Sequence, residues 1–433
     1  MSKMELLQEC AQRRQKLMAK VGTGVMILAS APLSYHHKDV EHKYRQEADL
    51  YYFTGFPEPE TVAVIAPQHP EHRFVLFVRP KDKEKETWSG YRVGVEAAKT
   101  LYGADAVYPI GELDEHLPKY LEGADTIYYS FGQNEKVNQQ VLQHYRQLLA
   151  TYGKRGTGPK QIADSRFLTT PLRQYKSDYE LAQIRQAVAI AVQAHQHVRA
   201  IARPGMYEYE LEAILEGDFR KGGAMGCAYP SIVASGANSC ILHYVENNRQ
   251  MQPGDVVLID AGCCYNYYNS DITRTFPLEG KFTSEQQAIY DIVLTAQRQA
   301  IAQVRPGKTI NDVHQAAVHT IVAGLLDLGL LAGSPEEIIE KELYKPFFMH
   351  RTSHWLGIDV HDSGFYKQEG EWAVLQAGMV ITVEPGIYIS PTIEPGEGQP
   401  PVADHWRGIG IRIEDDVLVT EGGHEVLTAG LSK

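Results

Sequence analysis

The N-terminal part of the chain alternates between short apolar runs and amphipathic stretches, a pattern typical of an α/β domain. Apolar residues recur at helical spacing over residues 5–20 and 137–152, which predicts two helices. Short β-branched runs at 61–66 and 73–78, bounded by proline and charged residues, predict strands. The polar, histidine-rich stretch 35–43 predicts a turn.

The pattern changes near residues 170–176, and the chain becomes strongly helical beyond this point. Ser177 and Glu180 form S-x-x-E directly before an apolar-periodic segment, in which the serine accepts an amide hydrogen bond and the glutamate accepts one in return. A helix is therefore expected to start there. We predict an N-terminal α/β domain over residues 1–174 and a second domain over 175–433.

The second domain mixes helical and strand periodicity, which predicts an α+β fold. Beyond the helix that starts at Ser177, helices are expected at 208–221, 284–304 and 310–328. Strand-type segments are expected within 255–276, 379–389 and 408–420.

Length and charge narrow the class of protein. A chain of 433 residues is too long for one ordinary core and is expected to form two domains. The net charge of −12 disfavours binding to nucleic acid or to an anionic membrane. Five cysteines without C-x-x-C spacing predict neither a disulfide framework nor a thiolate zinc site. Without a secretory signal or an apolar run of ~18 residues, we expect a cytoplasmic protein.

Two aspartates follow or precede strand-like segments of the second domain. Asp260 ends the apolar run 256–259, where an unpaired buried carboxylate would be costly and needs a partner. Asp271 opens the alternating segment 271–276, and two adjoining strands could bring both carboxylates together. Either residue alone is equally compatible with a structural aspartate at a strand end or in a turn.

Two glutamates occupy similar positions. Glu384 terminates the β-branched run 380–383, and Pro385 then takes the chain out of the ladder. Glu414 alternates with Arg412 on one face of an apolar segment, so this face is either solvated or partnered. A salt-bridged sheet surface would give the same pattern.

Histidines supply candidate nitrogen ligands. His354 lies in a segment with three histidines, HRTSHWLGIDVHD, whose glycine permits close backbone approach to an ion. His243 is an isolated candidate in an apolar setting, where a hydrogen-bonded core histidine is the commoner role.

Charge balance links these residues into one site. Four carboxylates carry −4 and two divalent ions +4, so a cluster with one neutral histidine is neutral with two ions and badly under-neutralised with one. Hard oxygen donors with one nitrogen favour manganese, magnesium or a similar ion, and we expect manganese. The predicted ligands are Asp260, Asp271, His354, Glu384 and Glu414.

At these residues the sequence resembles the pita-bread metallopeptidase family, and within it aminopeptidase P. The matching motifs are LIDAG, SDITRTFP, HRTSHWLGIDVHD, VEPGIYI and GIRIEDD in the second domain, and DLYYFTGF in the first. The resemblance implies a creatinase-like N-terminal domain followed by a pita-bread catalytic domain. It also implies hydrolysis that releases the N-terminal residue from peptides with proline in second position.

The resemblance assigns further roles. It implies that Asp260 chelates one ion, that Asp271 and Glu414 bridge both, and that His354 and Glu384 hold the other. Glu384 is also the candidate proton shuttle. The remaining implied roles are contact with the reacting carbonyl for His243 and His361, a share in the proline-side pocket for His350, Tyr388 and Arg412, and reach into a neighbouring subunit's active site for Trp88.

Three other functions are considered at this point. Prolidase uses the same ligands on Xaa-Pro dipeptides, although the stretch TSHW looks more like aminopeptidase P. A metal-free relative, either a creatinase-type hydrolase or a binding protein, is disfavoured because all five ligand positions are intact. A methionine aminopeptidase is less compatible with the large N-terminal domain. The family resemblance implies homodimers or homotetramers.

Overall fold

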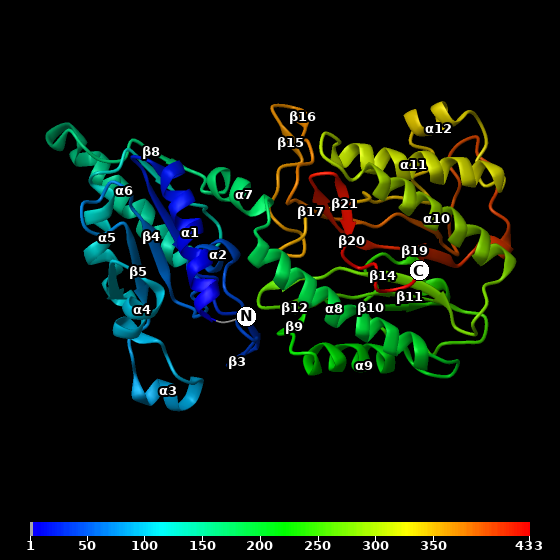
Figure 1. The fold of residues 1–433 in the computed structure, drawn as a ribbon, viewed down its shortest axis with the longest axis horizontal. Helices are drawn as coiled ribbons and strands as arrows, with labels where there is room; N and C mark the ends of the chain where they lie inside the picture. Colours follow the sequence, from blue (N-terminus) through cyan, green and yellow to red (C-terminus); the bar gives the residue numbers. More distant parts are fainter. Residues whose placement is uncertain (1–2) are drawn as a thin grey trace. The chain divides into compact units, whose positions relative to one another are not determined.

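The computed structural model describes residues 3–433, and the chain divides into two compact units, Met1–Leu172 and Arg173–Lys433 (Figure 1). The predicted boundary after residue 174 lies beside this division. No helix within residues 3–433 is long and apolar enough to cross a membrane.

The first unit is built on one six-stranded sheet with the order β6-β5-β4-β1-β7-β8. The central strand β1 pairs antiparallel with β4 and parallel with β7, so the sheet is mixed. Its strands are β1 Val25–Ala29, β4 Val62–Ile65, β5 Phe74–Val78, β6 Ala106–Pro109, β7 Thr126–Tyr128 and β8 Gln161–Ala163. Its helices are α1 Lys3–Val21, α2 Ala48–Thr54, α3 Lys83–Ser89, α4 Gly94–Tyr102, the 3₁₀ turn η1 Ile110–Glu112, α5 Leu113–Leu121, α6 Glu135–Arg155 and α7 Arg166–Gln174, the last of which crosses the division.

The histidine-rich stretch 35–43 differs from its prediction as a simple turn. It forms a small hairpin of β2 Tyr35–His37 and β3 Val40–Glu41, with Lys38 at φ 45° in the turn. Both strands are exposed, so no apolar alternation marks them in the sequence.

The second unit contains several small antiparallel sheets, of which β10-β11-β14, β17-β20-β21 and β18-β19 matter for the site. Its strands are β9 Gly226–Cys227, β10 Ile232–Ser235, β11 Val256–Asp260, β12 Cys263–Tyr265, β13 Tyr268–Asn269, β14 Thr273–Pro277, β15 Lys367–Gln368, β16 Glu371–Trp372, β17 Val380–Val383, β18 Gly386–Ile389, β19 Ile409–Arg412, β20 Asp415–Thr420 and β21 Gly423–Val426. Its helices are α8 Asp178–Ile201, α9 Glu208–Lys221, η2 Gly236–Cys240, α10 Ser284–Gln303, α11 Ile310–Asp327, α12 Pro335–Glu340 and η3 Asp404–Trp406.

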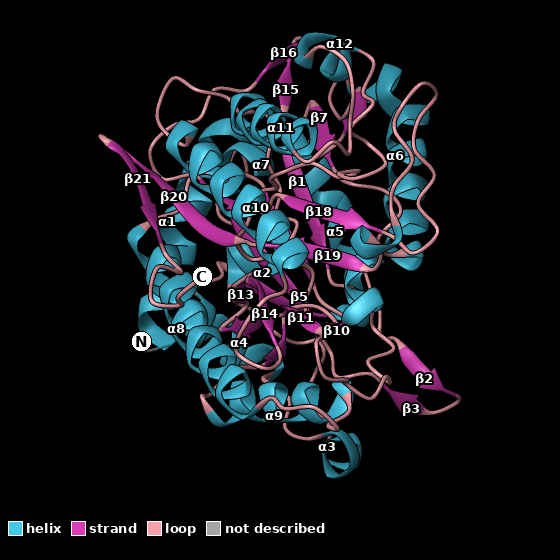
Figure 2. Ribbon diagram, turned by 90° about the vertical axis from the view of Figure 1, so that its right-hand side faces the viewer, coloured by secondary structure: helices cyan, strands magenta, loops and turns pink. Residues whose placement is uncertain are grey.

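Two helix pairs enclose these strands from opposite sides (Figures 1 and 2). The pair α8 and α9 packs its apolar face on β11 and β14, and the pair α10 and α11 packs on β17, β18 and β19. Each helix pair therefore has its own hydrophobic core. The strands between the two pairs carry polar residues at their ends.

The helix boundaries in this unit follow local chemistry. Ser177 and Glu180 form the predicted capping box at the start of α8. The same reciprocal arrangement starts α10 at Thr283 and α11 at Thr309. The predicted helices beginning at 208, 284 and 310 are confirmed as α9, α10 and α11.

A buried histidine on α8 makes stability depend on pH. Burial lowers the pKa of His195 to about 4, and its Nε2 lies 2.9 Å from the carbonyl oxygen of Ala261. Because the unfolded-state pKa is near ~6.5, the unfolded chain takes up this proton first, and stability falls as pH drops from ~6.5 towards 4. We expect His195→Gln to reduce the loss of unfolding free energy between pH 7.5 and 5 by about 2 kcal/mol.

The measurement is urea unfolding of metal-stripped wild type and variant at both pH values. Chelation keeps metal release from contributing to the difference. An equal pH dependence in the two proteins would contradict the assignment to His195.

Candidate metal centre and active site

Two antiparallel strands bring the predicted aspartates together. In the register of β11 with β14, Asp260 lies opposite Thr273, two positions beyond Asp271. The hydroxyl oxygen of Tyr229 lies 2.7 Å from Oδ1 of Asp260 and 2.5 Å from Oδ1 of Asp271. This hydroxyl carries one proton and can donate to only one of the two oxygens at a time. The aspartate oxygen that does not receive this proton requires another hydrogen-bond donor or a cation.

The glutamates arrive from the neighbouring strands. Glu384 follows β17, and the Thr382 hydroxyl donates to its Oε1 at 3.2 Å. Glu414 lies between β19 and β20, and the Thr273 hydroxyl donates to its Oε2 at 2.7 Å. Threonines on the strands thus fix one oxygen of each glutamate and leave the other available.

His354 is oriented by hydrogen bonds of its backbone N–H and of its ring. The His354 N–H donates to the Thr382 hydroxyl at 3.1 Å, and Nδ1 lies 3.0 Å from the carbonyl oxygen of Trp355. An Nδ1 proton donated to that carbonyl leaves Nε2 with its lone pair free for a ligand. Nε2 lies 3.3 Å from Oδ2 of Asp271 and 3.5 Å from Oε1 of Glu384.

The electrostatics of this cluster require added positive charge. Burial raises the pKa of Asp260, and it raises the pKa of Glu384 to about 7. It also raises the pKa of Glu414 well above its usual value. Neighbouring carboxylates raise each of these pKa values further. Burial alone would lower the pKa of His354, but Asp271 and Glu384 raise it to about 9. In residues 3–433 the cation hydrogen-bonded to these carboxylates is Arg412, which donates to Oδ2 of Asp260 at 2.6 Å.

The residues present fit divalent cations. Ligand atoms of Asp271, His354 and Glu414 all lie within 4.8 Å of one another. Asp260 and Glu384 interact electrostatically with the same carboxylates and extend the set to four carboxylates and one imidazole. Hard oxygen donors with one nitrogen suit Mn²⁺, Mg²⁺ or a similar ion.

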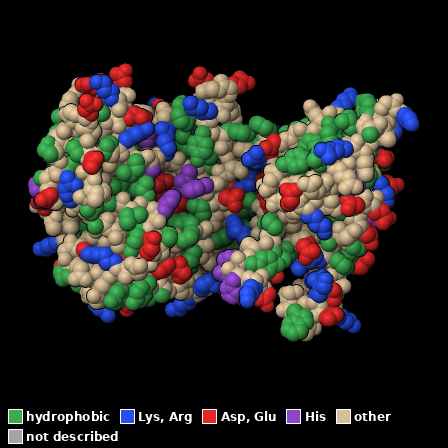
Figure 3. Space-filling view, turned by 180° about the vertical axis from the view of Figure 1, so that it is seen from behind, with side chains coloured by type: hydrophobic (Ala, Val, Ile, Leu, Met, Phe, Trp, Pro, Cys, Tyr) green, Lys and Arg blue, Asp and Glu red, His purple; other side chains and the backbone are tan. Residues whose placement is uncertain are grey.

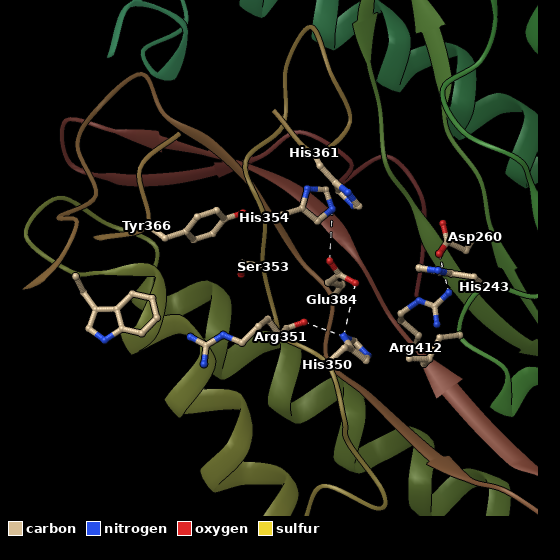
Figure 4. A pocket seen from close by; sticks show the side chains of 12 residues that line it. His243, Asp260, His350, Arg351, Ser353, His354, His361, Tyr366, Glu384 and Arg412 are labelled. Atoms are coloured by element: carbon tan, nitrogen blue, oxygen red, sulfur yellow. Dashed lines mark hydrogen bonds and ion pairs between the residues drawn. The ribbon is translucent and has the colours of Figure 1, made fainter. Parts of the chain in front are cut away.

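The cluster opens into a cavity of about 710 Å³ (Figure 4). Histidine side chains gather on the hollowed face of this unit (Figure 3). The cavity is lined by Leu242, His243, Asp260, His350, Arg351, Ser353, His354, His361, Tyr366, Trp372, Glu384 and Arg412. Its size is in the range of pockets that enclose small ligands.

Of the residues predicted to contact substrate, four lie on the cavity wall and one lies directly behind it. His243 and His361 line the cavity with exposed side chains, and the His361 ring lies 4.4 Å from the His354 ring. His350 and Arg412 also line it, and both contact the buried Tyr388 hydroxyl, at 2.8 and 2.9 Å respectively. Tyr388 therefore stands behind the cavity wall and holds two residues that form it.

Trp88 lies outside this group. It is on α3 of the first unit with 87% of its surface exposed. Its predicted role in a neighbouring subunit stays a prediction.

Several residues of the site were not anticipated from the sequence. Tyr229 connects both aspartates but lies in a loop, where no periodicity singles it out. Asp416 accepts a hydrogen bond from the Asp271 N–H at 3.1 Å, and it could have been suspected as the last acid of the run that begins at Glu414. Arg351 lines the cavity and lies within the motif HRTSHWLGIDVHD, where no role was predicted for it, and Trp372 lines the cavity outside every motif considered above.

Comparison with known proteins decides the family. A family model described as metallopeptidase family M24 matches residues 182–421, which include all five candidate ligands. The chain belongs to metallopeptidase family M24. A second model, described as the aminopeptidase P N-terminal domain, matches residues 10–128.

Similar M24 proteins span nearly the whole chain. The Xaa-Pro aminopeptidase of Escherichia coli K12 is 42% identical over 428 residues, covering 98% of this chain and 95% of that protein. The solved structure of Pseudomonas aeruginosa aminopeptidase PepP is 46% identical and superposes with a TM-score of 0.93, covering 100% of this chain and 96% of that one. A structure of zinc-substituted E. coli aminopeptidase P in complex with product is 41% identical, with a TM-score of 0.93 and the same coverage.

These likenesses confirm the predicted fold class, a creatinase-like N-terminal domain followed by a pita-bread catalytic domain. They also confirm the prediction of a metal-dependent hydrolase. The identity of the metal and the roles of single residues remain predictions.

Proposed function

We propose that the protein is an Xaa-Pro aminopeptidase that uses two divalent ions to release the N-terminal residue from peptides with proline in second position. The observation that carries the proposal is the cluster of four buried or half-buried carboxylates and one imidazole at the wall of a peptide-sized cavity. The similarity to Xaa-Pro aminopeptidases over 98% of the chain supports the substrate class.

Each predicted ligand has a distinct place in this proposal. Asp260, Asp271, His354, Glu384 and Glu414 would hold the two ions. When bound, such ions lower the pKa of a water and polarise a carbonyl group. The donor set favours Mn²⁺ as the ion.

Glu384 is positioned to move the proton. Its carboxylate lies at the cavity wall, where it can accept a proton from attacking water and return it. The acceptor of the returned proton is the proline nitrogen, which must be protonated before the bond breaks. Glu384 lines the cavity, so both transfers can occur without a relay.

His361 and His350 are expected to stay neutral on the cavity wall. Partial burial lowers the pKa of His361, and burial lowers the pKa of His350 to about 4. A neutral imidazole N–H at His361, together with His243, can donate to the oxygen that gains negative charge during attack. His350 and Arg412 are fixed by Tyr388, which supports a role in shaping the proline side of the cavity.

The free amine of the substrate is expected to lie beside the carboxylates. Its positive charge complements a cluster that requires cations, and this places the bond one residue from the N-terminus next to Glu384. A proline amide lacks an N–H and has a fixed ring geometry, so it needs a dedicated pocket.

The experiment compares Xaa-Pro-Yaa tripeptides, Xaa-Pro dipeptides and Xaa-Ala-Yaa controls, using metal-stripped protein with and without added Mn²⁺. We expect cleavage of the proline tripeptides only, dependent on metal, and two metal ions per chain by elemental analysis. Preference for dipeptides would favour prolidase, and inactivity on every peptide with metal bound would contradict the proposal.

Location and assembly are also proposed from the family. We infer a cytoplasmic homodimer or homotetramer in which Trp88 reaches a neighbouring subunit. The exposure of 87% at Trp88 and 94% at the nearby Tyr91 supports an aromatic surface available to a second copy. Sedimentation of wild type and Trp88→Ala tests this role.

A further inference from the structure

The active-site cavity extends beyond the metal ligands to a second wall, formed by Arg351, Tyr366 and Trp372 (Figure 4). Arg351 directly follows His350 in the chain, and Trp372 ends the small hairpin of β15 and β16. In Figure 4 the Arg351 side chain points away from the side chains of Asp260 and Arg412. The cavity therefore has an acidic end and a basic, aromatic end.

Arg351 is held in place but its charge is not neutralised. Its Cζ lies 5.1 Å from the centre of the Trp372 ring, and one of its terminal nitrogens donates to Oδ1 of Asn311 on α11 at 3.0 Å. Within residues 3–433 its guanidinium forms no ion pair with a carboxylate. Lys367 adds a second positive charge 4.7 Å from the centre of the same ring.

The other cationic residue of the cavity wall differs in this respect. Arg412 donates to Asp260 and to Tyr388, so its charge is already matched. Partial burial lowers the pKa of Arg351, and its side chain stays accessible from the cavity. A planar guanidinium with free donors in a cavity is suited to binding a carboxylate through two parallel hydrogen bonds.

Tyr366 links the two ends of the cavity. Burial raises the pKa of Tyr366. The nearby charge of Glu384 also raises this pKa, and the charge of Arg351 lowers it. Its ring therefore lies within electrostatic reach of both the proposed proton shuttle and the guanidinium. Glu384, Tyr366 and Arg351 line the same cavity, so a substrate that reacts beside Glu384 can extend towards Arg351.

The polarity of a short peptide fits these two ends. Its N-terminal amine is attracted to the acidic cluster, so the residues after the scissile bond extend away from that cluster. The residue after proline then carries the C-terminal carboxylate of a tripeptide. We propose that Arg351, backed by Trp372, binds a carboxylate at or next to the residue that follows proline.

This inference rests on the proposed function and adds a preference that the metal centre cannot supply. The carboxylate can be the C-terminus of a tripeptide or an acidic side chain in a longer peptide. Two pairs of substrates separate these sources: Xaa-Pro-Yaa against its C-terminal amide, and amidated Xaa-Pro-Asp-Ala against amidated Xaa-Pro-Asn-Ala.

The decisive variant is Arg351→Gln, with kcat/KM measured for all four peptides. Wild type is expected to favour a carboxylate member of at least one pair by roughly ten- to hundredfold, the size of one charge-assisted interaction. In the variant, kcat/KM should fall much more for the carboxylate member than for the amide or asparagine member, so that the preference is lost. Arg351→Lys, which keeps the charge but not the planar fork, should retain part of it.

Lys345→Gln is the matched control. Lys345 interacts electrostatically with Arg351 but pairs with Glu342 at 2.5 Å and lies outside the cavity lining. Its replacement removes one nearby positive charge without touching the second wall, so the preference should persist. Equal thermal stability of the two variants excludes misfolding as the cause of any difference.

Calorimetric binding of Pro-Ala and Pro-Ala amide to the purified protein separates failure of this inference from failure of the proposed function. Tighter binding of the free acid, lost in Arg351→Gln, would support the subsite even if no peptide were cleaved. Cleavage of Xaa-Pro peptides without any carboxylate preference, or a preference unaffected by Arg351→Gln, would overturn it.

Discussion

Replacing Glu384 by glutamine is expected to lower kcat for Xaa-Pro-Yaa cleavage by roughly 10³-fold or more, while the protein remains folded. The amide keeps the size of the side chain but removes a charge that faces His354 at 3.5 Å. It also removes the carboxylate that is proposed to carry the proton from water to the proline nitrogen. Steady-state kinetics at saturating metal measure the effect.

The control is Glu421→Gln, which removes an exposed carboxylate in the turn after β20 and should leave kcat unchanged. Elemental analysis of the Glu384 variant separates loss of a ligand from loss of the proton shuttle. A kcat within threefold of wild type, with metal bound, would show that Glu384 carries neither role.

Asp362→Asn is expected to lower the free energy of unfolding by about 3–5 kcal/mol, the usual effect of breaking a buried ion pair. Asp362 lies beside His361 and binds the Arg173 guanidinium and Lys176, whose Nζ is 2.8 Å away. The side chains of Lys176 and Asp362 are 1% and 2% exposed, so the variant leaves a buried ammonium without its counter-ion. Urea unfolding at pH 7.5 measures the loss.

The pH dependence of this effect has a definite sign. Burial alone would raise the pKa of Asp362, but Lys176 and Arg173 outweigh it and hold the pKa below its usual value. The stabilisation is therefore present above the unfolded-state pKa of ~3.9 and is lost as pH falls below it. The difference between wild type and Asp362→Asn should shrink in that range. Asp404→Asn, which changes a fully exposed carboxylate beside Arg407, should have a far smaller effect on stability than Asp362→Asn.

Much of the fold follows from local sequence patterns. The apolar periodicity and capping residues of α8, α9, α10 and α11 place these helices correctly, because each signal is contained within a few neighbouring residues. The exposed hairpin of β2 and β3 could not be found in the same way. Its strands pair with each other and bury nothing, so they leave no apolar alternation.

The site shows the same division between local and distant information. Asp260 and Glu384 stand out because an acid that ends a buried apolar strand requires compensation. The proximity of Tyr229 to both aspartates cannot be read from the chain, because it depends on how a loop returns to the strands. The partnership of Lys176 with Asp362 joins residues 186 positions apart and carries no sequence signal.

The two helix pairs of the second unit have separate hydrophobic cores, and the candidate ligands are divided between them. Asp260 ends β11 and Asp271 lies just before β14, and both strands pack on α8 and α9. His354, Glu384 and Glu414 are held by segments around β17, β19 and β20. Cations shared by both groups would act as a non-covalent cross-link through the middle of the unit. Loss of metal would then first loosen the contact between the two hydrophobic cores. Faster amide hydrogen exchange would be concentrated in β11, β14 and β17 before either helix pair opens.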